Sequence, residues 1–508
     1  MEKAFTFFLL TLFLLMARFP VNFGNLSFLV SLDLRSNNFH GNLPQEMARL
    51  HWLKFLDLSF NNFIGDVPSW FRFLHQLQVL KIGHNSFTGS IPSSFSNISK
   101  LETLNMGYNS IEGQIPKLIG SLINLRELNM RGNKLIGSIP LSLSNASRLE
   151  TLDISYNSLQ GNIPEGIGNL HNMNWLSLQY NQLSGPFTIS NISRVEFIEF
   201  TGNSLSGSLP NGLCNGLPIL KGLYLSTNKL HGHMPTSLSN CSQLQLLDLS
   251  ENEFDGPIHS EIGRLSNLQT LYLGTNHFTG IIPQEIGNLV NLAELAMEKN
   301  QITGSVPISI FNISSLQILS AWQNNLSGFL PREIGNLTDM QHLQISGNKL
   351  IGEIPKEISN LVELEELDLG FNSLSGSLSP NMCSILSNIE ELYLGNLTNL
   401  VGTIPHSISN CSKLTKLDLS GNKLTGLIPC SLGYLTHLCI LPVSVGNFST
   451  SLIKFYANNC KIKGIIPNDF GNLSSLLDLD LSENSLVLSI PKTIGNLRNL
   501  QRFNLPFG

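Results

Sequence analysis

Charge is scarce in this 508-residue sequence: only 13% of its residues are charged, against about 25% in typical soluble proteins. The formal net charge is -6, and Lys and Arg do not gather in runs. This excludes the basic stripe that a nucleic-acid partner requires and the basic cluster that binds an anionic membrane surface. Uncharged polar residues, chiefly Asn, Ser and Gly, must cover the surface instead.

Long apolar runs are absent beyond the N-terminus. Ala4–Ala17 follows Lys3 and is too short to span a bilayer comfortably, but it has the length of a signal-peptide hydrophobic region. No small-x-small cleavage site follows it, which leaves open whether the leader is removed. We predict that residues 1–17 are a signal-peptide-like leader into the secretory pathway, and we expect no membrane span elsewhere.

Catalytic and metal-binding patterns are also missing. Asp469–Gly471 spells the DFG triplet of protein kinases, but it lies in a repeat turn and no other kinase motif accompanies it. His231 and His233 lie in a similar turn, with no carboxylate or Cys ligand at a fixed spacing. We therefore predict no enzyme activity, no metal and no cofactor.

What the sequence does contain is a repeat of 24 residues. An Asn recurs in one position from Asn37 to Asn181 and again from Asn252 to Asn372, each step being 24 residues. The unit reads LxxLxxLxLxxNxLxGxIP. A fixed period of this kind is typical of a solenoid, in which each unit buries its leucines only against its neighbours.

Each part of the unit has a structural reason. Leu-x-Leu alternation predicts a short strand with one face turned inward. The Asn side chain can donate and accept, so it can satisfy backbone groups of its own turn and of the neighbouring turn. Gly permits the bend, and Pro closes the unit. The predicted fold class is an α/β-type leucine-rich repeat solenoid, a horseshoe or superhelix with parallel strands on its concave face.

These LxGxIP units, over residues 24–505, resemble the extracellular domain of plant leucine-rich repeat receptor-like Ser/Thr kinases, most closely the branch that contains immune pattern receptors. The resemblance implies a peptide, protein or microbial ligand, a co-receptor ectodomain as partner, and the plasma membrane as location. It also implies an N-terminal cap, a transmembrane helix and a kinase, none of which this sequence shows. We therefore expect a truncated ectodomain, either secreted or retained in the endoplasmic reticulum.

The repeats are predicted at residues 24–429 and 452–508, with a shortened joint at 430–451. The step from Asn422 to Cys460 is 38 residues, where two units would take 48. The flanking strands must lose a partner, or the chain must bridge the gap, and we expect a kink or poor packing near Cys439–Leu441. We also expect the first coil, which lacks a cap, to expose its leucines.

Seven cysteines leave at least one unpaired. Two pairs lie in related, lengthened units at spacings of 27 and 28 residues, which places the members of each pair in adjacent coils. In an oxidising compartment we predict disulfides Cys214–Cys241 and Cys383–Cys411, the alternative being buried thiols. The remaining cysteines surround the joint and are left unassigned: Cys430, Cys439 and Cys460.

Asn-x-Ser/Thr sequons support an extracellular route, because most of them share one position of the unit. A glycan-bearing surface away from the working face is predicted there. The sequons are Asn25, Asn97, Asn145, Asn191, Asn240, Asn312, Asn325, Asn336, Asn396, Asn410, Asn447 and Asn472.

Ligand contacts are predicted at strand positions that point outward and depart from the common LDLS pattern. An exposed Trp flanked by carboxylates would suit a basic, extended peptide. The candidates are Trp175, Gln179, Phe197, Glu199, Tyr224, Tyr272, Glu294, Glu298, Trp322, His342 and Gln344. The leading functional prediction is a ligand-recognition ectodomain in defence or development signalling. The alternatives are a secreted inhibitor of a cell-wall hydrolase and a non-functional gene fragment.

Overall fold

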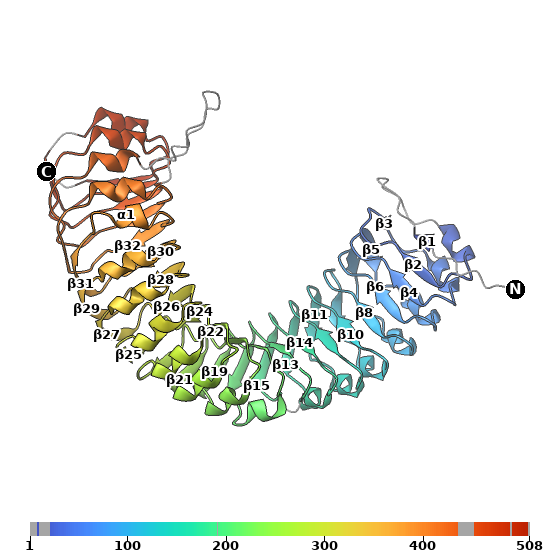
Figure 1. Ribbon diagram of the computed structural model, residues 1–508. Coiled ribbons are helices and arrows are strands. Elements are labelled where there is room, and N and C mark those ends of the chain that lie inside the picture. The colour runs from blue at the N-terminus through green and yellow to red at the C-terminus, as the bar shows by residue number, and fades with distance from the viewer. Residues whose placement is uncertain (1–7, 10–20, 190–191, 435–451, 488–489, 506–508) are drawn as a thin grey trace. The chain divides into compact units, whose positions relative to one another are not determined.

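The computed structural model describes residues 8–9, 21–189, 192–434, 452–487 and 490–505. The chain divides into two compact units, Met1–Phe254 and Asp255–Gly508, with the boundary inside β21 (Glu253–Pro257). Each unit is a stack of coils, and in most coils a short strand, a second short strand and a helical turn follow one another (Figure 1).

The first strands of successive coils pair in parallel, so each unit has a long sheet. In the first unit these strands are β2 (Ser31–Asp33), β4 (Phe55–Asp57), β6 (Val79–Lys81), β8 (Thr103–Asn105), β10 (Glu127–Asn129), β12 (Thr151–Asp153), β14 (Trp175–Ser177), β16 (Phe197–Glu199), β18 (Gly222–Tyr224) and β20 (Leu246–Asp248). In the second unit they are β22 (Thr270–Tyr272), β24 (Glu294–Ala296), β26 (Ile318–Ser320), β28 (His342–Gln344), β30 (Glu366–Asp368), β32 (Glu391–Tyr393), β34 (Lys416–Asp418), β35 (Lys454–Tyr456), β37 (Asp478–Asp480) and β39 (Arg502–Asn504).

The second strands form shorter parallel sheets. They are β3 (His40–Gly41), β5 (Asn62–Asp66), β7 (Ser86–Thr88), β9 (Glu112–Gln114), β11 (Lys134–Gly137), β13 (Ser158–Asn162), β15 (Gln182–Pro186), β17 (Ser204–Gly207), β19 (Lys229–His233), β21, β23 (His277–Thr279), β25 (Thr303–Gly304), β27 (Asn325–Phe329), β29 (Lys349–Glu353), β31 (Ser373–Ser377), β33 (Asn399–Val401), β36 (Lys463–Gly464) and β38 (Ser485–Leu486).

Most helical turns are 3₁₀ helices that begin directly after the Pro of the unit. They are η1 (Val21–Asn25), η2 (Gln45–Arg49), η3 (Ser69–Phe73), η4 (Ser93–Asn97), η5 (Ile119–Ser121), η6 (Leu141–Asn145), η7 (Glu165–Asn169), η8 (Leu213–Gly216), η9 (Thr236–Asn240), η10 (Ser260–Arg264), η11 (Gln284–Asn288), η12 (Ile308–Asn312), η13 (Arg332–Asn336), η14 (Lys356–Asn360), η15 (His406–Asn410), η16 (Cys430–Tyr434), η17 (Asn468–Asn472) and η18 (Lys492–Asn496), with one α-helix, α1 (Met382–Ile385), among the described residues.

The repeat asparagine joins each coil to the next. Asn85 Nδ2 donates to the carbonyl of Leu58 in the preceding coil at 2.9 Å and to that of Ile82 in its own turn at 3.2 Å. Its Oδ1 accepts from the backbone N–H of Phe63 at 3.0 Å. This half-buried amide therefore satisfies three backbone groups that would otherwise cost free energy in the core. The role predicted for the asparagine is confirmed.

The core of each coil is made by the middle residue of its strand. Leu56, Leu80 and Leu104 are 0% exposed, while their strand neighbours are mostly half-buried. The bend that follows requires glycine: Gly89 has φ +69°, and a Cβ there would lie 2.6 Å from Oδ1 of Asp66 in the preceding coil. The predicted leucine-rich repeat solenoid with parallel strands is confirmed.

At the N-terminal coil the expectation of exposed leucines holds for Leu26 only. Leu32 and Leu34 are each 1% exposed, although Leu26 is 44% exposed. The free edge of β2 is covered by the backbone of β1 (Phe8–Leu9), which pairs with it in parallel register. Residues 1–7 and 10–20 lie outside the described residues, so the leader assignment stays a prediction.

At the joint the sheet continues. β34 pairs directly with β35, Leu417 standing opposite Phe455, so neither strand lacks a ladder partner. Of the two expected outcomes, bridging of the gap by the chain is the one found. Cys439–Leu441 lies outside the described residues, and the predicted kink there is untested.

Cys460 takes the place of the repeat asparagine in the coil after the joint. Its Sγ donates to the Leu419 carbonyl at 3.3 Å, and burial raises the pKa of this thiol, which keeps it a neutral donor. A thiol has no amide oxygen, so it offers only a weak substitute for the asparagine contacts.

Candidate functional site

Each long sheet presents one face on which side chains remain accessible. In β28, His342 and Gln344 are half-buried while Leu343 between them is 0% exposed. Because side chains alternate between the two faces, the residue two positions after the end of each strand points to the same accessible side. We call this surface the open face. The eleven predicted ligand candidates lie on it: Trp175, Gln179, Phe197, Glu199 and Tyr224 in the first unit, and Tyr272, Glu294, Glu298, Trp322, His342 and Gln344 in the second.

In the first unit the structure brings the candidates together. Trp175 stands opposite Phe197 in the β14–β16 register, and their ring centroids lie 4.7 Å apart. Gln179 donates its side-chain N–H to the carboxylate of Glu199, and Tyr224 stands opposite Glu199 on β18. The cluster combines exposed aromatic area with a polar edge, as protein-binding surfaces do.

Glu199 differs from its prediction. It is only 8% exposed, with the Gln179 amide hydrogen-bonded to its carboxylate and Tyr224 opposite it on β18. Burial raises the pKa of Glu199, the hydrogen bond from Gln179 opposes this, and the nearby Asp153 charge adds to the rise. Glu199 therefore orients Gln179 and is poorly placed for direct contact with a ligand.

In the second unit Trp322 has a partner that the sequence did not reveal. Lys299 places its Nζ 4.8 Å from the centroid of the Trp322 ring. Trp322 is half-buried, and the carboxylate of Glu298 lies over Gly274 in the preceding coil. Tyr272 donates its hydroxyl to Glu294. One face of the Trp322 ring is therefore already occupied by the Lys299 ammonium group.

A polar network follows along the same face. Glu366 accepts from Gln344 at 2.9 Å and lies 3.3 Å from Nδ1 of His342. Glu391 accepts from Lys416 and from the Tyr393 hydroxyl, each at 2.6 Å. Burial alone would raise the pKa of Glu391, but these two hydrogen bonds lower it overall. In this part of the sheet each of these carboxylates has a nitrogen partner.

Beside this network lies a hollow of about 430 Å³ on the open face of the second unit. We call it the glycine hollow. It is lined by Trp322, Gln323, Ser346, Gly347, Asp368, Gly370, Phe371, Tyr393, Gly395 and Asp418. Of these residues only Trp322 was a sequence candidate. The sequence feature that could have revealed the hollow is the pair of glycines, Gly370 and Gly395, two positions beyond β30 and β32. Most coils carry a residue with a side chain there.

The first unit carries an aromatic row that sequence reasoning also missed. Its members each directly precede a repeat asparagine: Phe60, His84, Tyr108, Tyr156 and Tyr180. Neighbouring rings stack at centroid distances of 4.1 Å, 4.3 Å and 4.6 Å. At the coil that has glycine in this position, the guanidinium of Arg131 lies 4.7 Å from the Tyr156 ring and 5.7 Å from the Tyr108 ring. The recurrence of aromatics in one position was the available signal.

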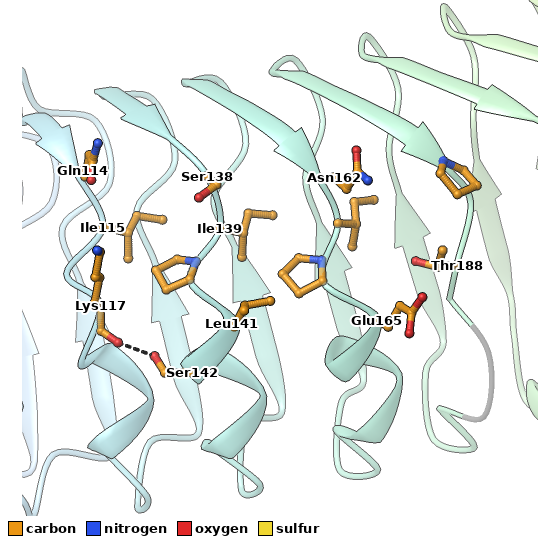
Figure 2. Close-up of a pocket in the computed structure, with 14 residues that line it drawn as sticks. Gln114, Ile115, Lys117, Ser138, Ile139, Leu141, Ser142, Asn162, Glu165 and Thr188 are labelled. Carbon is orange, nitrogen blue, oxygen red and sulfur yellow. Dashed lines mark hydrogen bonds between the residues drawn. The ribbon is translucent and has the colours of Figure 1, made fainter.

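A second hollow, of about 600 Å³, lies in the first unit where the Ile-Pro segments of successive coils run side by side (Figure 2). Ser142 donates to the carbonyl of Lys117 there at 2.6 Å. Ile115 and Ile139 are 2% exposed, so the apolar atoms belong to the core. None of the residues lining this hollow was a ligand candidate, and its shape follows from the repeat itself.

Both predicted disulfides are present. The Cα atoms of Cys214 and Cys241 lie 5.1 Å apart, and those of Cys383 and Cys411 lie 4.8 Å apart. They join adjacent coils at the two lengthened units, as an oxidising compartment permits. Among the described cysteines, Cys430 and Cys460 are unpaired.

The sequons fall into two groups. Those in the shared position are the exposed last residues of 3₁₀ helices: Asn25, Asn97, Asn145, Asn240, Asn312, Asn336, Asn410 and Asn472. Asn325 begins β27, and Asn396 has φ +55°; both are half-buried. Asn191 and Asn447 lie outside the described residues. Glycosylation itself stays a prediction.

Over the described ranges, no cluster of three or more His, Cys, Asp or Glu side chains could hold a metal ion. No helix in the described part of the chain has the length and apolarity to cross a membrane.

The fold and the open face define a leucine-rich repeat recognition protein. Family models confirm the repeat class: one described as a leucine-rich repeat region matches residues 220–399, and one described as leucine rich repeat matches residues 28–50, 52–74, 148–170, 413–435 and 451–473. A comparison with curated protein sequences gave no significant match.

Solved structures narrow the class. The plant peptide hormone receptor RGFR1, in complex with RGF2, is 34% identical over 94% of this chain and 78% of its own, with a TM-score of 0.82. The Arabidopsis receptor kinase HAESA ectodomain, in complex with an IDA peptide hormone, is 31% identical over 96% of this chain and 80% of its own, with a TM-score of 0.85. This chain belongs to the family of plant leucine-rich repeat receptor kinase ectodomains.

Proposed function

We propose that this chain is the ligand-recognition ectodomain of a plant cell-surface receptor kinase that senses a peptide in defence or development signalling. The observation that carries the proposal is the likeness to receptors that hold peptide hormones, at more than 30% identity over nearly the whole chain. The open face supplies what such a ligand requires: aromatic anchors beside polar groups on rigid strands.

The same likeness supports a co-receptor as second partner. The structure of HAESA with IDA and the co-receptor SERK1 is 27% identical to this chain, with a TM-score of 0.75. The two disulfides support an extracellular location for the recognition domain. A leucine-rich repeat ectodomain is not catalytic, so the signalling chemistry belongs to a kinase.

The test is retention of peptides from plant extracellular fluid. The chain, secreted from plant cells and immobilised, is exposed to the small-peptide fraction, and the retained peptides are identified by mass spectrometry. We expect at least one peptide whose synthetic form binds with a Kd of about 1 μM or tighter by calorimetry. Trp175→Ala combined with Trp322→Ala should abolish retention, because both anchors on the open face are lost.

Trp52→Ala is the matched control. Trp52 is 57% exposed, in a turn outside the long-sheet strands, so its loss should leave retention unchanged. Equal retention by the Trp175→Ala, Trp322→Ala variant would contradict the proposal. Tight binding of a cell-wall hydrolase with loss of its activity would favour the inhibitor alternative, and a chain that is degraded before secretion would favour the gene fragment.

A further inference from the structure

We propose that the glycine hollow is a subsite for the guanidinium group of an arginine side chain. The inference rests on the proposed peptide-binding function and deepens it, because it states which side chain the ligand presents to β30–β34. The shape, the charge and the aromatic walls of the hollow each point to this group.

The floor of the hollow is backbone. Gly370 and Gly395 occupy the positions two residues beyond β30 and β32, where neighbouring coils carry Trp322, Ser346 and Ser420. A Cβ at Gly395 would lie 2.8 Å from Oδ2 of Asp418. Even an alanine there would require this carboxylate to shift.

Two carboxylates at the hollow have no ion pair. Ser420 donates its N–H and its hydroxyl to Oδ1 of Asp418, while no described residue donates to Oδ2, which lies against Gly395. Asp368 accepts from Ser346 and from the Gly370 N–H, and no Lys, Arg or His of the described chain pairs with it. None of the residues lining the hollow, all of them described, is basic.

Some other carboxylates of the same sheet do have ion-pair partners. Glu391 is paired with Lys416, and Asp478 is paired with Arg502 at 2.9 Å. Burial raises the pKa of Asp368, and the charges of Glu366 and Asp418 add to the rise. A bound cation would reverse that effect, because an opposite charge within a few ångströms favours the ionised carboxylate.

The aromatic walls select guanidinium over a hydrated ion. Two aromatic rings line the hollow: Phe371, which is 63% exposed, and Trp322, whose ring already receives Lys299 on one face. A planar, weakly hydrated guanidinium can stack on an aromatic ring while it donates to a carboxylate, whereas an ammonium offers only a point charge.

The experiment compares two probes of the same shape. The full chain is titrated at pH 7 with Nα-acetyl-arginine amide and with Nα-acetyl-citrulline amide, which lacks only the charge, by ligand-observed NMR. We expect the arginine probe to bind at least about fivefold more tightly, which corresponds to about 1 kcal/mol. Asp368→Asn and Asp418→Asn should each reduce arginine binding toward the citrulline value.

Asp248→Asn is the matched control for Asp418→Asn. Asp248 makes the same two contacts with Ser250 in the first unit, away from the hollow, so arginine binding should not change. Equal binding of the two probes to the unmodified chain overturns the proposal, even if a variant fails to fold. Arginine binding that survives both substitutions overturns it as well. A chain that binds a peptide lacking arginine and shows no probe preference would contradict the subsite but retain the proposed function.

Discussion

The asparagine side chain sets the stability of each coil at the scale of a single residue. Asn109 Nδ2 donates to the carbonyls of Ile82 and Met106, each at 3.1 Å, and its Oδ1 accepts from Phe87 at 3.0 Å. Asn109→Ala should destabilise its coils by about 1–3 kcal/mol, because three backbone groups lose their partner. Hydrogen exchange of the local amides measures this, and Asn124→Ala, at an exposed site, should have little effect.

A pH titration of arginine-probe binding tests Asp368. Its pKa is raised by burial, so as pH falls the carboxylate gains a proton before an ordinary Asp does, and binding should weaken at a higher pH than the titration of an ordinary Asp would give. The other titratable groups around it are His342, Glu366, Glu391, Tyr393 and Asp418. His342→Gln should leave the acidic limb in place; if that variant removes the limb, the titration belongs to His342.

Contacts of single side chains are also the feature that the sequence predicts least well. The hydrogen-bonding role of the asparagine follows from its chemistry and its fixed position. The stacking of Lys299 on Trp322 and the burial of Glu199 depend on which way long side chains turn across coils, and spacing does not determine that. Position alone identified the open face, but it did not identify which of its carboxylates lack a partner.

At the scale of the element, the disulfides stabilise the two lengthened units. Cys383 and Cys411 close a loop of 28 residues beside α1. Replacing both with Ser should cost about 2–4 kcal/mol of local stability. Hydrogen exchange should show faster opening of β32 and β34, and the matching change at Cys214 and Cys241 should act only near β18 and β20. Identical, global effects of the two changes would contradict this.

The coil after the joint offers a stabilising change. Cys460→Asn should strengthen the contact with the Leu419 carbonyl and supply an amide oxygen as acceptor for the preceding coil, by about 0.5–1.5 kcal/mol per hydrogen bond. Thermal unfolding of the variant would show a raised midpoint. Cys460→Ala, which removes the donor, should move the midpoint in the opposite direction.

The elements themselves were the most predictable feature. Leu-x-Leu, Asn, Gly and Pro at fixed positions specify strand, ladder, bend and helical turn one coil at a time. The disulfide pairs followed because their spacing placed them in adjacent coils. The covering of β2 by β1 was missed, because the apolar residues of β1 carry no repeat signal that would assign them to a sheet edge.

At the scale of the whole chain, the exposed sequons predict where sugars can be carried. Most of the described sequons lie at the ends of 3₁₀ helices, away from the open face. We expect glycans at Asn97, Asn145 and Asn312, and low occupancy at the half-buried Asn325 and Asn396. Enzymatic deglycosylation in water labelled with heavy oxygen, followed by peptide mass spectrometry, measures each site. High occupancy at Asn396 would contradict the prediction.

The direct pairing of β34 with β35 has a consequence for how such a chain tolerates change. The two strands pair through their backbone groups. The register of this pairing does not depend on the number of residues that connect one coil to the next. Insertions or deletions between coils can therefore accumulate in a gene without altering the recognition surface.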